Sequence, residues 1–446
     1  MPVKATIVYR LSSSPLVKWL DMQKEQITIL GKTNFRMQNM QFGIKDIDRQ
    51  RHMYMVGQTG MGKSTLMLNM LIQDINKGKG VALIDPHGDL AEQLLNHIPQ
   101  RRMTDVIYVN PSDIEYPAGL NLLDDSYLVN KHLVAAHIID IFKKIWADSW
   151  GPRLEYILRN TILALLECGG HSLLSIPRLL IDSEFRSFVL NRVSDPVVRI
   201  FWQMEYELYP KVFRTETISP IQNKVGQFLS VPVMRNILGQ SINKINFREA
   251  MDSGRILIVN LAKGRLGEDN SGLLGSLIVS KIFLTAMSRS DIPAEDRNSF
   301  TVYIDEFQSF ASDSFAQTLS EMRKFGLHLV LAHQYLAQLP HQLRSAVFGN
   351  IGTVVSFRIG AEDGEYLEQE FHPTFRAGDL QSLSAYETYI RLSIDGKTCD
   401  AFSARTLPEQ AIVQSHCDAI IQLSRIRYGS EKETVESHIN AWMNDP

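Results

Sequence analysis

Residues 57–65 read Gly57-Gln58-Thr59-Gly60-Met61-Gly62-Lys63-Ser64-Thr65, and this stretch decides the fold that the sequence predicts. It has the Gly-x4-Gly-Lys-[Ser/Thr] spacing of a P-loop, whose glycines let backbone N–H groups turn toward phosphates. The apolar run Met53 to Val56 precedes it and is typical of a buried strand, and Leu66 to Ile72 follows with the pattern of a helix. The N-terminus of that helix would add a partial positive charge. The order of strand, glycine-rich loop and helix is the one that phosphate binding requires.

The last residues of this loop carry the expected chemistry. The backbone of residues 57–65 would surround the phosphates of a nucleotide, Lys63 would reach the β- and γ-phosphates, and the Ser64 hydroxyl would hold Mg²⁺. The alternative is a glycine-rich turn that binds nothing. The flanking strand and helix favour the phosphate-binding interpretation.

A second signal is the stretch Phe300-Thr301-Val302-Tyr303-Ile304-Asp305-Glu306-Phe307. An apolar run that ends in two acids is expected of a buried parallel strand with carboxylates at its carboxyl end. Asp305 suits the water shell of Mg²⁺, and Glu306 suits the polarisation of an attacking water, which a nucleotide hydrolase needs. The alternative is an ordinary strand that ends at an acidic turn.

A third strand, Leu327 to Ala332, is followed by His333 and Gln334. A polar side chain just beyond a core strand can contact the γ-phosphate, so Gln334 is the candidate sensor of hydrolysis. The alternative is a polar residue of an ordinary turn, since many strands end in one.

The composition is that of a globular protein, with 446 residues, 44% hydrophobic and 21% charged, enough for one large or two moderate domains. The net charge of −3 excludes a strongly basic chain, so a nucleic-acid partner would have to meet local basic patches. The candidates, each more typical of solvated surface, are Arg49-Gln50-Arg51, Arg101-Arg102 and Lys143-Lys144. Three scattered cysteines fit a reducing compartment: Cys168, Cys399 and Cys417.

The N-terminus has no signal-peptide pattern, and the longest apolar stretch, Leu273 to Met287, is interrupted by Lys281. We therefore expect this stretch to be a buried helix. We also expect a chain that has no transmembrane segment of its own and is cytoplasmic.

Strands alternate with helices along most of the chain, which predicts the α/β class with a parallel sheet covered by helices on both faces. The rhythm stops between about Leu128 and Ile242, where the apolar spacing is helical. We expect a β-rich lead-in at residues 1–45 with strands at Ala5–Tyr9 and Ile27–Leu30, a P-loop nucleotide-binding domain at 46–127 and 243–428, an all-α insert at 128–242, and a C-terminal tail at 429–446.

These motifs resemble the HerA–FtsK superfamily of ring-forming DNA motors, and most closely the type IV coupling proteins of conjugation and type IV secretion. The stretches that carry the resemblance span most of the chain after Arg51: Gly57–Thr65, Val81–Leu90, Trp150–Asn160, Tyr303–Phe307 and Arg323–Gln334. The resemblance implies a RecA-like P-loop sheet, ATP and Mg²⁺ as cofactors, and a hexameric ATPase with DNA in its pore. It also implies peripheral contact with the inner membrane through secretion-channel or relaxase proteins.

The resemblance further implies an active site at each subunit interface, completed by an arginine from the neighbour. Arg323, 18 positions after Asp305, resembles that arginine finger, and Arg358 is the second candidate. Such an arginine offsets the charge that spreads over the transferred phosphoryl group. For either residue the alternative is a solvated or salt-bridged surface arginine.

Coupling proteins usually carry N-terminal transmembrane helices, and this sequence departs from that pattern. Three functions therefore stay open: a conjugative DNA translocase, a HerA-like translocase that serves repair or phage defence with a partner nuclease, and a scaffold that is only locked by nucleotide. Glu306 separates the scaffold from the two motors, because a pure lock does not need a water-activating acid.

Overall fold

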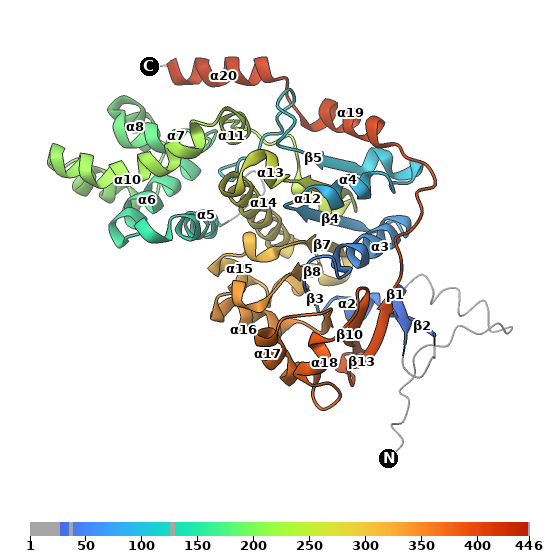
Figure 1. Cartoon of the computed structure of the whole chain (residues 1–446). Helices are drawn as coiled ribbons and strands as arrows, with labels where there is room; N and C mark the ends of the chain where they lie inside the picture. Colours follow the sequence, from blue (N-terminus) through green and yellow to red (C-terminus); the bar gives the residue numbers. More distant parts are fainter. Residues whose placement is uncertain (1–26, 35–38, 125–129, 445–446) are drawn as a thin grey trace.

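The computed structural model of the chain describes residues 27–34, 39–124 and 130–444 (Figure 1). The strand expected at Ala5–Tyr9 lies outside these residues. A small two-stranded sheet pairs β11 (Ser393–Ile394) with β12 (Lys397–Thr398). The main sheet has eleven strands. In their order across the sheet, the strands are β2 (Gln41–Lys45), β1 (Ile27–Thr33), β13 (Phe402–Thr406), β10 (Glu387–Arg391), β9 (Thr353–Ser356), β3 (Met53–Val56), β8 (Leu327–His333), β7 (Phe300–Ile304), β4 (Gly80–Asp85), β6 (Ile256–Asn260) and β5 (Val106–Val109).

The seven strands from β9 to β5 are parallel, and the four from β10 to β2 continue the sheet in antiparallel pairing. Successive residues of the parallel strands enter two different hydrophobic clusters, because side chains alternate between the faces of a sheet. In β3, Tyr54 and Val56 pack on the face covered by α14 (Glu268–Ser288), whereas Met53 and Met55 pack on the face covered by α3 (Lys63–Asn76). Burial on both faces explains why these strands are apolar throughout, and it confirms the predicted fold class.

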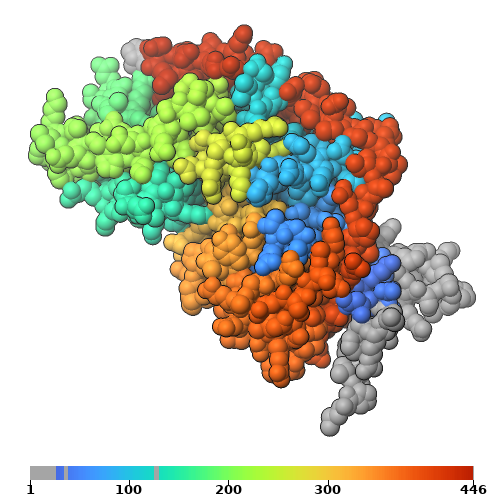
Figure 2. All heavy atoms as spheres, in the orientation of Figure 1, coloured from blue at the N-terminus to red at the C-terminus, as the bar shows by residue number. Residues whose placement is uncertain are grey.

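Residues 131–238, which lie between β5 and β6, are largely helical and form the green lobe of Figures 1 and 2. Its helices are α5 (Lys131–Ile145), α6 (Pro152–Cys168), α7 (Ser175–Ile181), α8 (Ser183–Leu190), α9 (Pro196–Ile200), α10 (Lys211–Leu229) and α11 (Pro232–Leu238). Aromatic rings fill its interior, with Phe142 stacked on Trp146 at 4.4 Å between centroids. The boundaries 128 and 242 for an insert domain stay a proposal.

The described part of the expected β-rich lead-in adds two strands, β1 and β2, to the main sheet. Strand β1 pairs with β13, with Gly31 opposite Thr406, and β2 pairs with β1 in turn. The added strands satisfy the backbone groups that β13 would otherwise expose at the edge. Sequence patterns indicate a strand here but do not say that its partner lies more than 370 residues away.

The C-terminal residues pack against the helical lobe. Helix α20 (Lys432–Asn444) buries Val435 and Ile439, and Asn236 of α11 donates a hydrogen bond to Glu436 at 3.1 Å. The remaining helices are α2 (Asp46–Arg49), α4 (Asp89–Leu95), α12 (Phe247–Asp252), α13 (Lys263–Leu266), α15 (Asp313–Thr318), α16 (His341–Asn350), α17 (Ala361–Phe371), α18 (Ala377–Gln381) and α19 (Cys417–Tyr428).

One helical stretch in the described part of the chain, Glu268–Asp291, is long and apolar enough to cross a bilayer by length and composition. However, 83% of its apolar window is buried inside the protein, against the sheet, as expected of a core helix.

Candidate active site

The P-loop connects β3 to α3 at the carboxyl edge of the sheet. Gly60 and Gly62 have φ of 77° and 110°, in the left-handed region that residues with a Cβ rarely adopt. Helix α3 starts at Lys63 with no side chain capping its N-terminus. Its first backbone N–H groups are therefore available to an anion.

Lys63 folds back over this loop. Its Nζ donates to the carbonyl of Gly57 at 2.6 Å and to that of Gln58 at 3.2 Å. Burial lowers the pKa of Lys63, and the nearby carboxylates of Asp305 and Glu306 oppose that shift. The ammonium thus lies where a nucleotide's terminal phosphates can replace the two carbonyls as partners.

Asp305 and Glu306 follow β7, two strands away from the P-loop strand, and both are only 6% exposed. The pKa of Asp305 is raised to about 7, mainly by burial and further by the neighbouring carboxylates of Glu306 and Asp85, while Lys63 opposes the shift. Three carboxyl groups, those of Asp85, Asp305 and Glu306, thus lie close together near Lys63, and a bound cation would offset their charge. In the part of the chain that the structure describes, no cluster of three acidic, histidine or cysteine side chains forms a ready metal cage. Mg²⁺ does not need one, because it usually keeps waters and binds one or two protein ligands plus substrate phosphates.

The carboxylate of Glu306 is held at both oxygens. Gln334 donates its amide to Oε1 at 2.7 Å, and Gln308 donates its amide to Oε2 at 2.8 Å. The backbone of Glu306 has φ of 46°, which is rare for a side chain of this size and indicates strain at the strand end. The structure thus brings Gln334 to the acid that would activate water, and β8 is the element that places it there.

Gln308 is a site residue that the sequence reasoning missed. It lies in the short 3₁₀ turn Phe307–Ser309 after β7, and a glutamine at such a position has no distinctive sequence signal. Lys144 of α5 fastens the same turn, since its Nζ donates to the carbonyls of Gln308 at 2.9 Å and Ser309 at 2.8 Å. Hydrogen bonds of Lys144 and Gln308 therefore connect the helical lobe to Glu306.

The two candidate arginines lie at opposite ends of the parallel strands, Arg323 at the amino ends and Arg358 at the carboxyl ends. Arg323 is in the 3₁₀ turn Met322–Phe325 before β8, so it is far from its own P-loop. Its exposed side chain makes no hydrogen bond or ion pair with any described residue. It lines a cleft of about 490 Å³ together with Arg297 and Lys324.

Arg358 follows β9 and lies beside the P-loop of its own chain. Its Nε donates to Oε1 of Gln58 at 3.1 Å, and its carbonyl accepts from the Gln58 N–H at 2.8 Å. This placement fits contact with the nucleotide of the same chain, whereas the placement of Arg323 fits contact with a neighbour's nucleotide.

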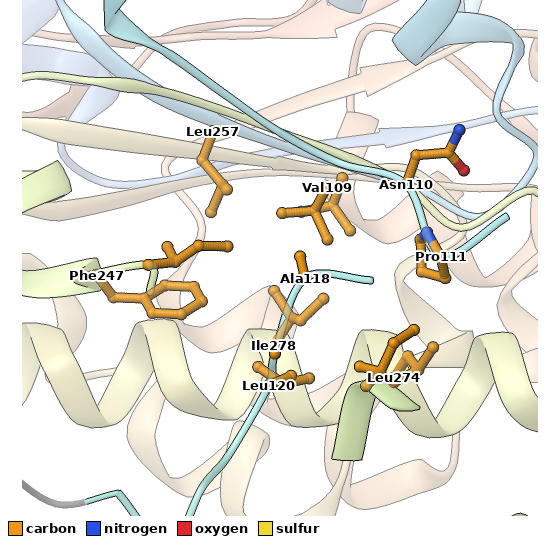
Figure 3. Close-up of a pocket in the computed structure, with 13 residues that line it drawn as sticks. Val109, Asn110, Pro111, Ala118, Leu120, Phe247, Leu257, Leu274 and Ile278 are labelled. Carbon is orange, nitrogen blue, oxygen red and sulfur yellow. The ribbon is translucent and has the colours of Figure 1, made fainter. Parts of the chain in front are cut away.

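A separate hollow between the edge of the sheet and α14 is not a second site of this kind. It has room for about 20 Å³ and is lined mainly by aliphatic side chains such as Val109, Leu257 and Leu274 (Figure 3). A void of that size holds at most about one water, so it is a packing defect of the core.

The parallel sheet, with a P-loop at the end of one strand and two acids at the end of a strand two positions away, defines a RecA-like P-loop nucleoside triphosphatase. Within that class the chain belongs to the family described as Helicase HerA, central domain, whose model matches residues 44–282. No curated protein sequence matches the chain.

Solved structures with the same fold include two of the plasmid coupling protein TrwB. The complex with ADP and Mg²⁺ has 15% identity and a TM-score of 0.61, covering 89% of this chain and 94% of that one. The complex with a non-hydrolysable GTP analogue has 15% identity and a TM-score of 0.62, with the same coverage. VirB4 of Thermoanaerobacter pseudethanolicus has 13% identity and a TM-score of 0.53, covering 85% of this chain and 95% of that one. These similarities establish the fold.

Proposed function

We propose that this protein is an ATP-driven DNA translocase that works as a ring, of the type of conjugative coupling proteins. The observation that carries the proposal is the arrangement around Glu306. A carboxylate held at both oxygens by Gln308 and Gln334, across one strand from the P-loop, is suited to activating water and is unnecessary in a nucleotide-locked scaffold.

The proposed reaction is hydrolysis of the β–γ phosphoanhydride bond. The P-loop amides and Lys63 would hold the triphosphate, and Ser64 with Asp305 would hold Mg²⁺, which neutralises phosphate charge when bound. Glu306 would accept a proton from the attacking water. The hydrogen bonds from Gln308 and Gln334 would hold its carboxylate in a fixed orientation for this step. The other residues of the loop from Gly57 to Thr65 would act mainly through their backbone.

A shared site explains why Arg323 has no partner within the described part of its own chain. In a head-to-tail ring, two different surfaces of neighbouring subunits meet. The surface with Arg323, at the amino ends of the parallel strands, would then face the neighbour's P-loop, and Arg323 would reach the γ-phosphate bound there. The connection from α5 through Lys144 to the Gln308 turn supports coupling between the helical lobe and hydrolysis. We propose that DNA binds in the pore of the ring and that its affinity depends little on the base sequence of the DNA.

The test mixes two inactive variants, Lys63→Ala and Arg323→Ala. In random rings about one interface in four combines an intact lysine with an intact arginine, so hydrolysis should partly return. Mass measurement with ATP and DNA should show a closed ring in the same samples, and DNA should raise the wild-type rate. A mixture as inactive as its parents, together with an active wild-type monomer, would refute the shared site.

The family match also supports a HerA-like translocase that serves a nuclease in repair or defence. Affinity purification from the native host separates the two roles. A relaxase or secretion-channel protein supports conjugative transfer, whereas a nuclease supports repair or defence.

A further inference from the structure

Tyr386 lies beside the P-loop although the two are more than 320 residues apart in the chain. Its backbone N–H donates to the carbonyl of Met61 at 2.9 Å, and its carbonyl accepts from the N–H of Thr406 at 2.9 Å. The P-loop and β13 thus hold this residue from two sides. Its φ is 67°, in the left-handed region that a bulky side chain rarely occupies.

The ring of Tyr386 lies against Gly62, the residue before Lys63. A Cβ built on Gly62 would come within 2.7 Å of Cδ1 and 3.3 Å of Cε1 of that ring. Gly62 is therefore needed for close approach as well as for its backbone conformation. Even so, Tyr386 remains 41% exposed, so much of it faces solvent at the rim of the loop.

The positions of the acids decide which end of a nucleotide would meet this ring. The γ-phosphate must face β7 and β8, where Asp305, Glu306 and Gln334 lie, on one side of β3. The nucleoside end must then leave the P-loop on the other side, toward β9 and β10. Because β10 runs antiparallel to β9, it begins at the carboxyl edge of the sheet, and Tyr386 directly precedes it.

Neither the backbone conformation of Tyr386 nor its hydroxyl explains why this residue is a tyrosine. Asparagine or glycine would adopt the same backbone with less strain. The phenol hydroxyl donates to and accepts from no described residue, so the ring is not kept for a hydrogen bond to the protein. What the tyrosine adds at this position is an exposed aromatic face next to a phosphate site.

We propose that Tyr386 is the nucleobase platform of this site and that its ring stacks on the base of the bound nucleoside triphosphate. The proposal rests on the nucleotide binding of the proposed function and adds the residue that holds the base. Stacking uses the π-face that every base has, so the platform favours nucleotides over bare polyphosphate without selecting strongly between adenine and guanine.

The test is titration calorimetry with MgATP and with inorganic tripolyphosphate. Tyr386→Asn keeps a residue that tolerates the left-handed backbone and removes the ring. It should weaken MgATP binding by about 5- to 150-fold, the range of one base–aromatic stack, and leave tripolyphosphate affinity unchanged. Tyr386→Phe, which keeps the aromatic ring, should bind MgATP about as tightly as the wild type. Tyr156→Ala, which removes a tyrosine of 42% exposure on α6, is the matched control and should change neither affinity.

Two results would overturn the proposal while leaving nucleotide binding intact. One is unchanged MgATP affinity in Tyr386→Asn, and the other is an equal loss for MgATP and tripolyphosphate, which would mean that the residue only shapes the P-loop. A wild-type protein that binds neither ligand would overturn both this proposal and the proposed function.

Discussion

Replacing Arg49 by methionine should destabilise the folded chain by about 3 to 5 kcal/mol, because it would leave a buried carboxylate without its main partner. Arg49 Nη1 and Nη2 donate to the two oxygens of Asp74 at 2.7 and 2.8 Å, and the two side chains are 6% and 0% exposed. Arg49 also donates to Thr28 of β1 at 2.8 Å and to the hydroxyl of Tyr303 on β7 at 2.6 Å. These hydrogen bonds thus connect the P-loop helix α3 to β1 near the edge of the sheet and to β7, the strand that Asp305 and Glu306 follow.

The size of the loss follows from what remains around Asp74. The Tyr303 hydroxyl still donates to it at 2.6 Å and the Lys79 ammonium stays 3.4 Å away, which favours the lower end of the range. Burial alone would raise the pKa of Asp74, but Arg49, with smaller contributions from Lys79 and the Tyr303 hydroxyl, outweighs burial and lowers the pKa to about 2. This depressed pKa contributes stability above pH 3.8 that is lost as the pH falls toward 2.

Urea unfolding followed by circular dichroism measures the effect. The double variant Arg49→Met with Asp74→Leu should recover most of the loss, because it removes both charges. Arg159→Met is the matched control: its half-exposed ion pair with Glu155 on α6 should be worth at most about 1 kcal/mol. A loss below about 1 kcal/mol in Arg49→Met, or a double variant no more stable than the single one, would refute the reasoning.

Glu306→Gln should keep ATP bound and slow hydrolysis by about a hundredfold or more, the contribution of a positioned base; single-turnover rates at the parental value would remove Glu306 from the mechanism. Lys144→Met should lower kcat while leaving the Kd for ATP unchanged, because it frees the turn that carries Gln308; a change in Kd alone would contradict the connection. Gly275→Ala should cost about 1 to 3 kcal/mol in urea unfolding, since its Cβ would come within 2.2 Å of the Phe310 ring. Burial lowers the pKa of His52 to about 4, with Arg323 adding to the shift, so stability should fall as the pH drops from 6.5 toward 4; His52→Gln should flatten that part of the pH profile.

Local patterns were sufficient for the elements that act through short-range chemistry. The P-loop spacing, the apolar strand before Asp305 and the apolar strand before Gln334 are each contained in fewer than about a dozen residues, so the sequence predicts them directly. The α/β class followed from their alternation with helices. The long apolar stretch interrupted by Lys281 also proved to be a core helix, α14.

Contacts between distant segments could not be predicted in this way. The sequence shows an amide at residue 334 and an acid at residue 306, but only the neighbouring of β7 and β8 puts Gln334 within 2.7 Å of Glu306. Gln308 went unnoticed, and Lys144 was noticed only as part of a basic patch, because a hydrogen bond to a carbonyl or carboxylate needs no particular motif. The sequence named Arg323 as the first candidate finger and Arg358 as the second, but only the structure shows that Arg358 lies beside its own P-loop.

The sequence by itself therefore determined the phosphate-binding loop, the acids and the class of the fold, since their physical causes are backbone freedom, charge and side-chain periodicity over a few residues. The tertiary structure decided which strand ends meet, which arginine faces its own P-loop, and that Tyr386 lies against Gly62. The reason is physical: strand order is set by burying both faces of one sheet and by pairing its edges, and those free energies depend on the whole chain at once.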